Sequence, residues 1–262
     1  MGWLNPPRPL EPAPPEERRL ITIELVIVFA VTLGLSGLSS LLTLLDSLLA
    51  PVPIKDQTIA INVPLARAGL IDLFKQLLGV VRLIAWGALG AYLLYRAGMK
   101  LAAIGLDRSR PGRDAAAGAG LAALIGIPGL AFYLAAHAAG FNLAVAPSTL
   151  DDTWWRPIAL SLLAFGNAWA EEVLVVGYLI TRLRQLGLSE NASLLVSSLV
   201  RGSYHLYQGF GGFIGNVVMG LVFGRVWQRS NRLWPLVIAH TLLDVVAFLG
   251  YALLREEVSW LP

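Results

Sequence analysis

Two adjacent carboxylates, Glu171 and Glu172, stand in the middle of an apolar run that is long enough to cross a membrane. A charged side chain at the depth of the bilayer costs roughly 2.5–3.5 kcal/mol on insertion scales. Two carboxylates side by side cost more, because like charges repel each other. Such a pair therefore needs a compensating partner, which can be a cation, a metal ion, a water-filled cavity or polar groups on other helices.

Candidate partners have helical spacing within apolar segments. Three segments each contain two polar residues four positions apart, namely Asn167 and Glu171, Arg201 and His205, and His240 and Asp244. Residues four apart lie on the same face of a helix. We therefore expect three helices that each turn a polar pair toward one shared cavity.

Carboxylate and imidazole groups in one cavity support hydrolysis of a polarised carbonyl. Both groups are ligands for zinc-type metals. They can also activate a water without a metal, with glutamate as the general base and histidine holding the water. Buried Glu and His serve proton-coupled transport as well, so a transporter is an alternative. A helix–helix hydrogen bond is the structural alternative for any one of these residues taken singly.

The composition places the chain among membrane proteins. Of its 262 residues, 56% are hydrophobic and 14% are charged, whereas a soluble domain is about 25% charged. The mean hydropathy is +0.66. The net charge is only +3, and the basic residues lie between apolar runs, which argues against a nucleic-acid partner. The chain has no cysteine, which excludes disulfides and thiolate catalysis.

The apolar segments predict an all-α, polytopic bundle. About 20 apolar residues cross a bilayer as a helix. Seven segments approach that length: 20–44, 70–97, 115–139, 157–183, 192–207, 210–227 and 233–254. We therefore expect about seven transmembrane helices in one membrane domain, 20–262, after a Pro-rich tail, 1–19. The segments 192–207 and 210–227 are short and Gly-rich where they meet, which is typical of a buried turn that lines a cavity.

The distribution of Lys and Arg predicts the orientation. The N-terminal tail and every second connection after it are rich in these residues, and the alternate connections are poor in them. Because cytoplasmic loops are enriched in Lys and Arg, the N-terminus is expected in the cytoplasm and the C-terminus outside.

The ordered motifs resemble those of the CAAX-protease and bacteriocin-processing family of intramembrane proteases, also called CPBP or ABI proteins. That family carries Glu-Glu-x-x-x-Arg, then Phe-x-x-x-His, then His-x-x-x-Asn or His-x-x-x-Asp. Glu171-Glu172, His205 and the His240 to Asp244 motif match these in order and type. The resemblance covers 159–247, and the three earlier spans carry no motif that we can assign.

The resemblance implies a role for each matched residue. Glu171 would be the general base on the attacking water, and Glu172 would support it. His205 would bind that water, and His240 with Asp244 would stabilise the oxyanion. In the alternative with a divalent metal such as zinc, Glu171, His205 and His240 would be the ligands. The family's mechanism has been argued both with and without a metal.

The function that the resemblance implies is endopeptidase cleavage of a peptide or protein substrate near or within the lipid bilayer. The expected location is the plasma membrane of a prokaryote. Prenylated CAAX tails are the substrates of eukaryotic members, and many relatives process other peptides. The alternatives are a catalytically inactive interaction or immunity protein of the same family and, from another class, a proton-coupled transporter.

Two positions depart from the family pattern. Val176 stands where the first motif has arginine, and Arg201 stands where the second motif has phenylalanine. We interpret the two departures as one exchange, in which Arg201 replaces the lost cation as the counter-ion of Glu171 or Glu172. If the family's arginine acts directly in catalysis, the chain would be a weakened or inactive member.

Overall fold

The structure, a computed structural model, describes residues 12–254 of the chain. Most of the predicted Pro-rich tail, residues 1–11, lies outside the described residues, as do residues 255–262 at the end of the predicted membrane domain. The first helix begins at Pro15, so the last five residues of the predicted tail, 15–19, are helical. Proline suits the first position of a helix, and the acidic Glu16 and Glu17 then lie at its positive end.

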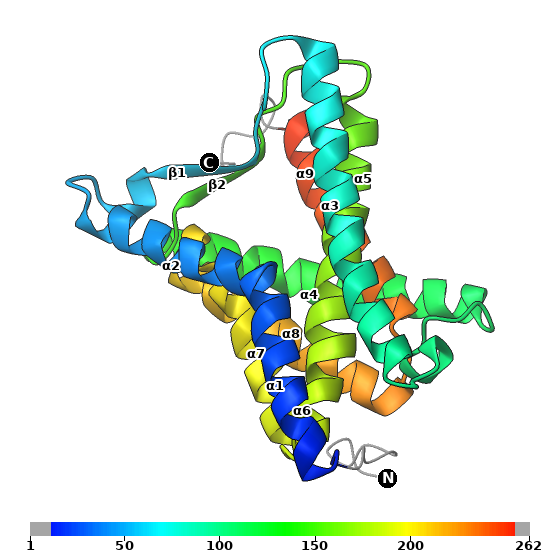
Figure 1. Ribbon diagram of the computed structural model, residues 1–262. Coiled ribbons are helices and arrows are strands. Elements are labelled where there is room, and N and C mark those ends of the chain that lie inside the picture. The colour runs from blue at the N-terminus through cyan, green and yellow to red at the C-terminus, as the bar shows by residue number, and fades with distance from the viewer. Residues whose placement is uncertain (1–11, 255–262) are drawn as a thin grey trace.

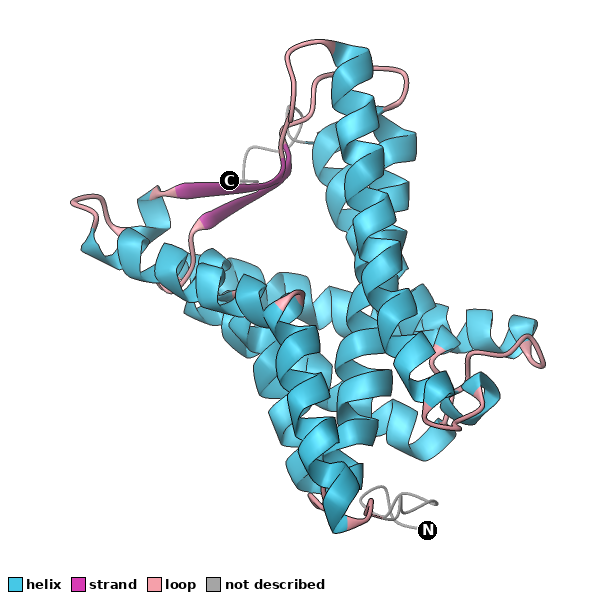
Figure 2. Ribbon diagram, in the orientation of Figure 1, coloured by secondary structure: helices cyan, strands magenta, loops and turns pink. Residues whose placement is uncertain are grey.

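The described residues are mainly helical, as the apolar pattern predicts (Figure 2). The α-helices are α1 (Pro15–Ala30), α2 (Leu33–Leu49), α3 (Gly69–Arg96), α4 (Pro111–Ala138), α5 (Arg156–Glu171), α6 (Thr181–Gln185), α7 (Glu190–Ser203), α8 (Phe210–Ser230) and α9 (Trp234–Leu254). A π-helix, Glu172–Ile180, joins α5 to α6, so that one rod of 30 residues runs over Arg156–Gln185.

The described residues contain five or six candidate spans, compared with the expectation of about seven. Five described helices are long and apolar enough to cross a membrane, and the number rises to six if α1 and α2 form one span. Those two helices meet at a bend of 51°, where one continuous span was expected. The segment 192–207 falls short because α7 has only 14 residues and the chain then turns.

The helices form an open arrangement around the long rod (Figure 1). In Figure 1, α3, α5 and α9 run side by side in the upper part, and α5 contacts both of the others. α7 and α8 pack against each other below, and α4 crosses behind to contact α8 and α9. The rod is the central element. Of an 18-residue apolar stretch of the rod, 67% is buried within the structure, compared with 6% of such a stretch of α4. Apolar side chains such as Ile127, which is 75% exposed, face outward, as in a lipid-facing surface.

A short two-stranded ribbon was not expected from the sequence. Strands β1 (Thr58–Asn62) and β2 (Ala144–Ser148) pair in parallel, with Ile59 opposite Val145. The ribbon bridges the two groups of helices, from the end of α2 to the upper part of the molecule (Figure 1). The strands are only five residues long and come from distant connections, so neither gives a strand signal of its own.

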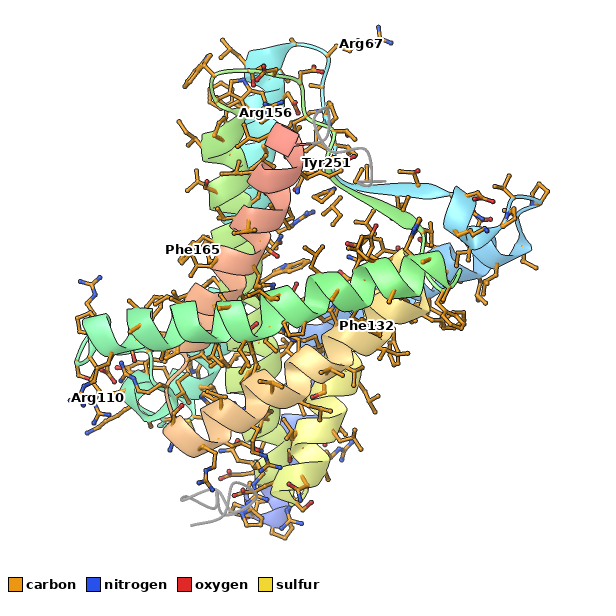
Figure 3. The ribbon with its side chains drawn as sticks, turned by 180° about the vertical axis from the view of Figure 1, so that it is seen from behind. Arg67, Arg110, Phe132, Arg156, Phe165 and Tyr251 are labelled. Atoms are coloured by element: carbon orange, nitrogen blue, oxygen red, sulfur yellow. The ribbon has the colours of Figure 1, made fainter. Side chains whose placement is uncertain are left out.

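The charged residues at the helix ends fit the predicted orientation, which stays a prediction. Figure 3 places Arg67 and Arg156 together at one end of the molecule, and Arg110 well away from them. Arg110 belongs to a connection that is expected on the cytoplasmic side, whereas the other two belong to connections expected outside. α4 continues through Pro128 as a single helix.

Candidate active site

The two carboxylates lie where the central rod changes its winding. Glu171 is the last residue of α5, and Glu172 begins the π-helix. π-Helical segments inside α-helices are rare and occur frequently at functional sites. The wider winding changes the directions in which the following side chains point. Glu172 is fully buried, whereas 11% of the Glu171 side chain is exposed.

Glu172 is held by two cationic or polar partners from other helices. The Arg201 guanidinium on α7 forms an ion pair with Glu172 Oε1. His240 Nδ1 on α9 lies 2.8 Å from the same oxygen. A carboxylate that pairs with arginine is ionised and can only accept hydrogen bonds, so His240 Nδ1 carries the hydrogen and donates it. Glu172 thereby links the rod to α7 and α9.

Glu171 has a different set of neighbours. The Tyr204 hydroxyl donates a hydrogen bond of 2.8 Å to Glu171 Oε2. The same oxygen lies 3.8 Å from Arg201 Nη2 and 3.9 Å from His205 Nε2. Arg201 is therefore within ion-pair distance of both carboxylates, as the counter-ion hypothesis requires. The Arg201 guanidinium also lies 5.7 Å from the centre of the Phe223 ring on α8, in a cation–π arrangement.

The early end of α7 brings His205 to the carboxylates. α7 ends at Ser203, and the chain turns through a short 3₁₀ segment, Leu206–Gln208. Gly209 closes the turn with a φ of 104°, a conformation that glycine adopts without strain. The turn is fixed to the connection before β2, because Leu143 N donates a 3.1 Å hydrogen bond to Gln208 O. The short hairpin thus places His205 beside the middle of the rod.

The third motif lies on the other side of Glu172. His240 Nε2 is 3.7 Å from Asp244 Oδ1, at the i, i+4 spacing expected from the sequence. The Asn167 side chain, one turn before Glu171 on α5, lies beside Asp244. Asp244 retains 21% exposure of its side chain. The imidazole is therefore held between two carboxylates, Glu172 at Nδ1 and Asp244 near Nε2.

Four buried polar atoms of this cluster have no hydrogen-bond partner within residues 12–254. They are Glu172 Oε2, Arg201 Nε, Arg201 Nη1 and His205 Nε2. Buried polar groups in native proteins are nearly always satisfied by protein or by water. His205 Nε2 and the Glu171 carboxylate are 3.9 Å apart, and two groups that each bond one water at about 2.8 Å can have this separation. The arrangement therefore has the geometry of a site for a shared water.

The donor set does not fit the expected metal site of Glu171, His205 and His240. In the described part of the chain, no three His, Cys, Asp or Glu side chains are grouped so that they can hold one metal ion. His240 Nδ1 is already bonded to Glu172. Among residues 12–254, no third ligand joins Glu171 and His205 at their side of the cluster. These positions favour water activation by the side chains themselves.

All seven residues that the sequence analysis named come together in this cluster, from α5, the π-helix, α7 with its following turn, and α9. The cluster members are Asn167, Glu171, Glu172, Arg201, His205, His240 and Asp244. Tyr204 belongs to it as well, although its role was not expected from the sequence. Its spacing of three residues after Arg201 is a sequence signal that could have singled it out. The remaining histidine, His137 on α4, stacks on Tyr133 instead.

The comparison with known families agrees with these motifs. No curated protein and no solved structure matches the chain. Residues 153–246 match the family model described as Rce1-like, type II CAAX prenyl endopeptidase Rce1-like. The match begins just before α5 and ends within α9, so it contains every residue of the cluster. This integral membrane chain therefore carries, at 153–246, a domain of the Rce1-like type within the CAAX-protease family that its motifs resemble.

Proposed function

We propose that the protein is an intramembrane endopeptidase that hydrolyses a peptide bond with a water activated by Glu171 and His205. The observation that carries the proposal is the separation of 3.9 Å between Glu171 Oε2 and His205 Nε2. Both side chains are partly exposed, at 11% and 17%, whereas Glu172 beside them is fully buried. A general base must have access to substrate and water, and of the two carboxylates only Glu171 has it.

The proposed reaction uses general acid–base catalysis. Gln208 Nε2 lies 3.4 Å from His205 Nδ1, and donation to Nδ1 leaves the imidazole hydrogen on Nε2, where it can hold the water oxygen. Glu171 removes a proton from the water as its oxygen bonds to the carbonyl carbon. The C–N bond then breaks, and Glu171 returns the proton to the amine that leaves. The products are a new carboxylate end and a new amine end.

The second carboxylate, Glu172, acts by positioning the side chains of Arg201 and His240. Glu172 fixes the Arg201 guanidinium and the His240 ring by contacts to a single oxygen, Oε1. The His240 ring lies between Glu172 at Nδ1 and Asp244 near Nε2, and in the proposed mechanism it carries a hydrogen on both nitrogens. We assign to this His240 imidazolium, oriented by Asp244, the stabilisation of the negative charge that develops on the carbonyl oxygen, a contribution that is usually large in acyl-transfer enzymes.

The proposed substrate is a peptide at the membrane, in the plasma membrane of a prokaryote. The family description names CAAX prenyl endopeptidases, so a lipid-modified peptide end is the first substrate to test. The cluster lies on helices that are long and apolar enough to span a bilayer, which fits a substrate delivered from the membrane.

The test is cleavage of a fluorogenic farnesylated CAAX peptide, and of an unmodified transmembrane peptide, by purified protein in liposomes. The wild type is expected to cleave at least one of them. Glu171→Gln is expected to lower kcat by roughly 100-fold or more, as loss of a general base does. Glu172→Gln is the matched variant, because it makes the same chemical change at the next residue. It is expected to reduce the free energy of unfolding, whereas Glu171→Gln leaves that quantity nearly unchanged.

Two outcomes would overturn the proposal. Cleavage at the wild-type rate by Glu171→Gln would show that Glu171 is not the general base. Absence of cleavage by the wild type for both peptide classes would favour the inactive interaction or immunity protein. A chelator distinguishes the mechanism without a metal from the metal-dependent one. Activity that is lost in EDTA and restored by zinc would favour the metal-dependent alternative.

A further inference from the structure

Tyr204 touches both members of the proposed catalytic pair. Its hydroxyl donates a 2.8 Å hydrogen bond to Glu171 Oε2. Its ring lies against the His205 imidazole, with 4.9 Å between the ring centres and a tilt of 45°. Tyr204 is 6% exposed, so water does not compete for these contacts.

The end of α7 makes this double contact possible. Consecutive residues in an α-helix point about 100° apart, which makes it difficult for two neighbours to approach one atom. α7 ends at Ser203, and Tyr204 and His205 follow in the turn. There, the Tyr204 hydroxyl bonds to Glu171 Oε2, and His205 Nε2 lies 3.9 Å from the same oxygen.

The contacts of the Glu171 carboxylate are concentrated on one of its two oxygens. Within the described residues, the Tyr204 hydroxyl donates to Oε2, and Arg201 and His205 lie 3.8 and 3.9 Å from the same atom. No described side chain donates to Oε1, and this atom is not among the buried polar atoms without a partner. Among the described side chains, the Tyr204 hydroxyl is therefore the hydrogen-bond donor that orients this carboxylate.

We infer that Tyr204 is a positioning residue, which fixes the Glu171 carboxylate through its hydrogen bond to Oε2 and so directs it at the water between this oxygen and His205 Nε2. The inference rests on the proposed function, in which Glu171 is the general base. A carboxylate held at one oxygen cannot rotate away from the reacting geometry. Orientation of this kind raises the rate of the chemical step rather than the affinity for substrate.

The chain offers a closely matched control. Tyr178 is also buried, lies on the same central rod as Glu171, and donates a 2.8 Å hydrogen bond to a carboxylate, Glu24 Oε1. Glu24 belongs to α1 and pairs with Arg182 at 2.8 Å, outside the catalytic cluster. Tyr178→Phe therefore removes the same kind of hydrogen bond without touching Glu171.

The experiment measures kcat and KM for the cleaved reporter peptide with Tyr204→Phe, Tyr204→Leu and Tyr178→Phe in liposomes. Tyr204→Phe is expected to lower kcat by roughly 10- to 100-fold and to leave KM within about twofold, since the lost contact orients a reacting group. Tyr204→Leu is expected to lower kcat further, because it also removes the packing on His205. Tyr178→Phe is expected to keep the wild-type kcat. Equal kcat values for Tyr204→Phe and Tyr178→Phe would overturn the inference.

An infrared measurement tests the contact without any substrate. The difference spectrum of wild type minus Glu171→Gln isolates the carboxylate bands of Glu171. These bands are expected to shift in the Tyr204→Phe background and to stay unchanged in the Tyr178→Phe background. Unshifted bands in Tyr204→Phe would overturn the inference, even where reporter cleavage depends on Glu171. Wild-type cleavage by Glu171→Gln would instead overturn the proposed function and, with it, the inference.

Discussion

The side chains of Arg201 and Glu172 form an ion pair inside the bundle, and neither of them is exposed. The pair connects α7 to the π-helix of the central rod. Val176, at the position where the family motif carries its arginine, is 1% exposed and lies four residues after Glu172. In this chain the counter-ion of the buried carboxylate therefore comes from the facing helix α7 and not from the rod itself.

Arg201→Met is expected to destabilise the protein by about 3–5 kcal/mol, because it leaves a buried carboxylate without its partner. The measurement is the free energy of unfolding in mixed micelles. The double variant Arg201→Met with Val176→Arg is expected to recover part of that loss, since the new guanidinium occupies the family position and uses the space that Arg201 leaves. Absence of any recovery would contradict the exchange of positions.

Asp244→Asn is expected to retain activity within a few-fold of wild type. Asparagine keeps an oxygen acceptor beside His240 Nε2, which is 3.7 Å from Asp244, and the family motif accepts either residue. Asp244→Ala removes the acceptor and frees the ring, so its kcat/KM is expected to fall by as much as about 100-fold, a cost typical of a misplaced catalytic group. Equal activities of the two variants would show that the acceptor at this position is unimportant.

Gly87→Ala tests the close approach that fixes the rod. A Cβ at Gly87 would lie 2.4 Å from Trp169 Nε1, the atom that donates to Ile84 O. The rigid indole cannot yield, so the variant is expected to lose about 1–3 kcal/mol of stability, as overpacked cores do. The control is Gly79→Ala on the same helix, whose Cβ would have its nearest contact at 3.8 Å.

Gly79→Ala is expected to be neutral or to stabilise by up to about 1 kcal/mol, because alanine costs less chain entropy in a helix. Thermal unfolding of both variants in one detergent gives the comparison. Similar unfolding temperatures for Gly87→Ala and Gly79→Ala would mean that the approach of α3 to Trp169 is not a constraint on the fold.

The connection between α3 and α4 is expected to make stability depend on acid pH. Hydrogen bonds, chiefly from Arg232 and secondly from Ser109, hold the pKa of Asp107 well below its ordinary value of 3.8. Arg232 reaches Asp107 at 2.6 Å and also contacts Asp114. Because the pKa is lower in the folded state, the contribution is fully present above about pH 4 and is lost as the pH falls below that value.

The measurement is the unfolding temperature of wild type and Asp107→Asn between pH 2 and pH 6, a window set by the ordinary aspartate value of about 3.9. The wild type is expected to lose more stability than Asp107→Asn on acidification. Parallel curves for the two proteins would contradict a stabilising role of Asp107. Because salt screens the attraction between Asp107 and Arg232, the difference between the wild type and Asp107→Asn is expected to be smaller at high salt.

The sequence by itself determined the fold class and the members of the cluster other than Tyr204. Composition and long apolar runs predict a helical membrane protein, because a bilayer requires backbone groups to be satisfied within the helix. The cost of unpaired charge at that depth singles out Glu171 and Glu172, and the i, i+4 spacing singles out Arg201 and His205. The expected shared helix face of Arg201 and His205 was wrong, because α7 ends at Ser203 and His205 lies in the following turn. These inferences need only local periodicity and residue chemistry.

Only the tertiary structure decided which contacts these residues make. Periodicity gives the face of a helix but neither its partner helix nor the point where its winding changes. The π-helix after Glu171, the end of α7 at Ser203 and the pairing of β1 with β2 depend on packing between distant segments. For that reason the division of roles between Glu171 and Glu172, and the place of Tyr204 beside them, became visible only in three dimensions.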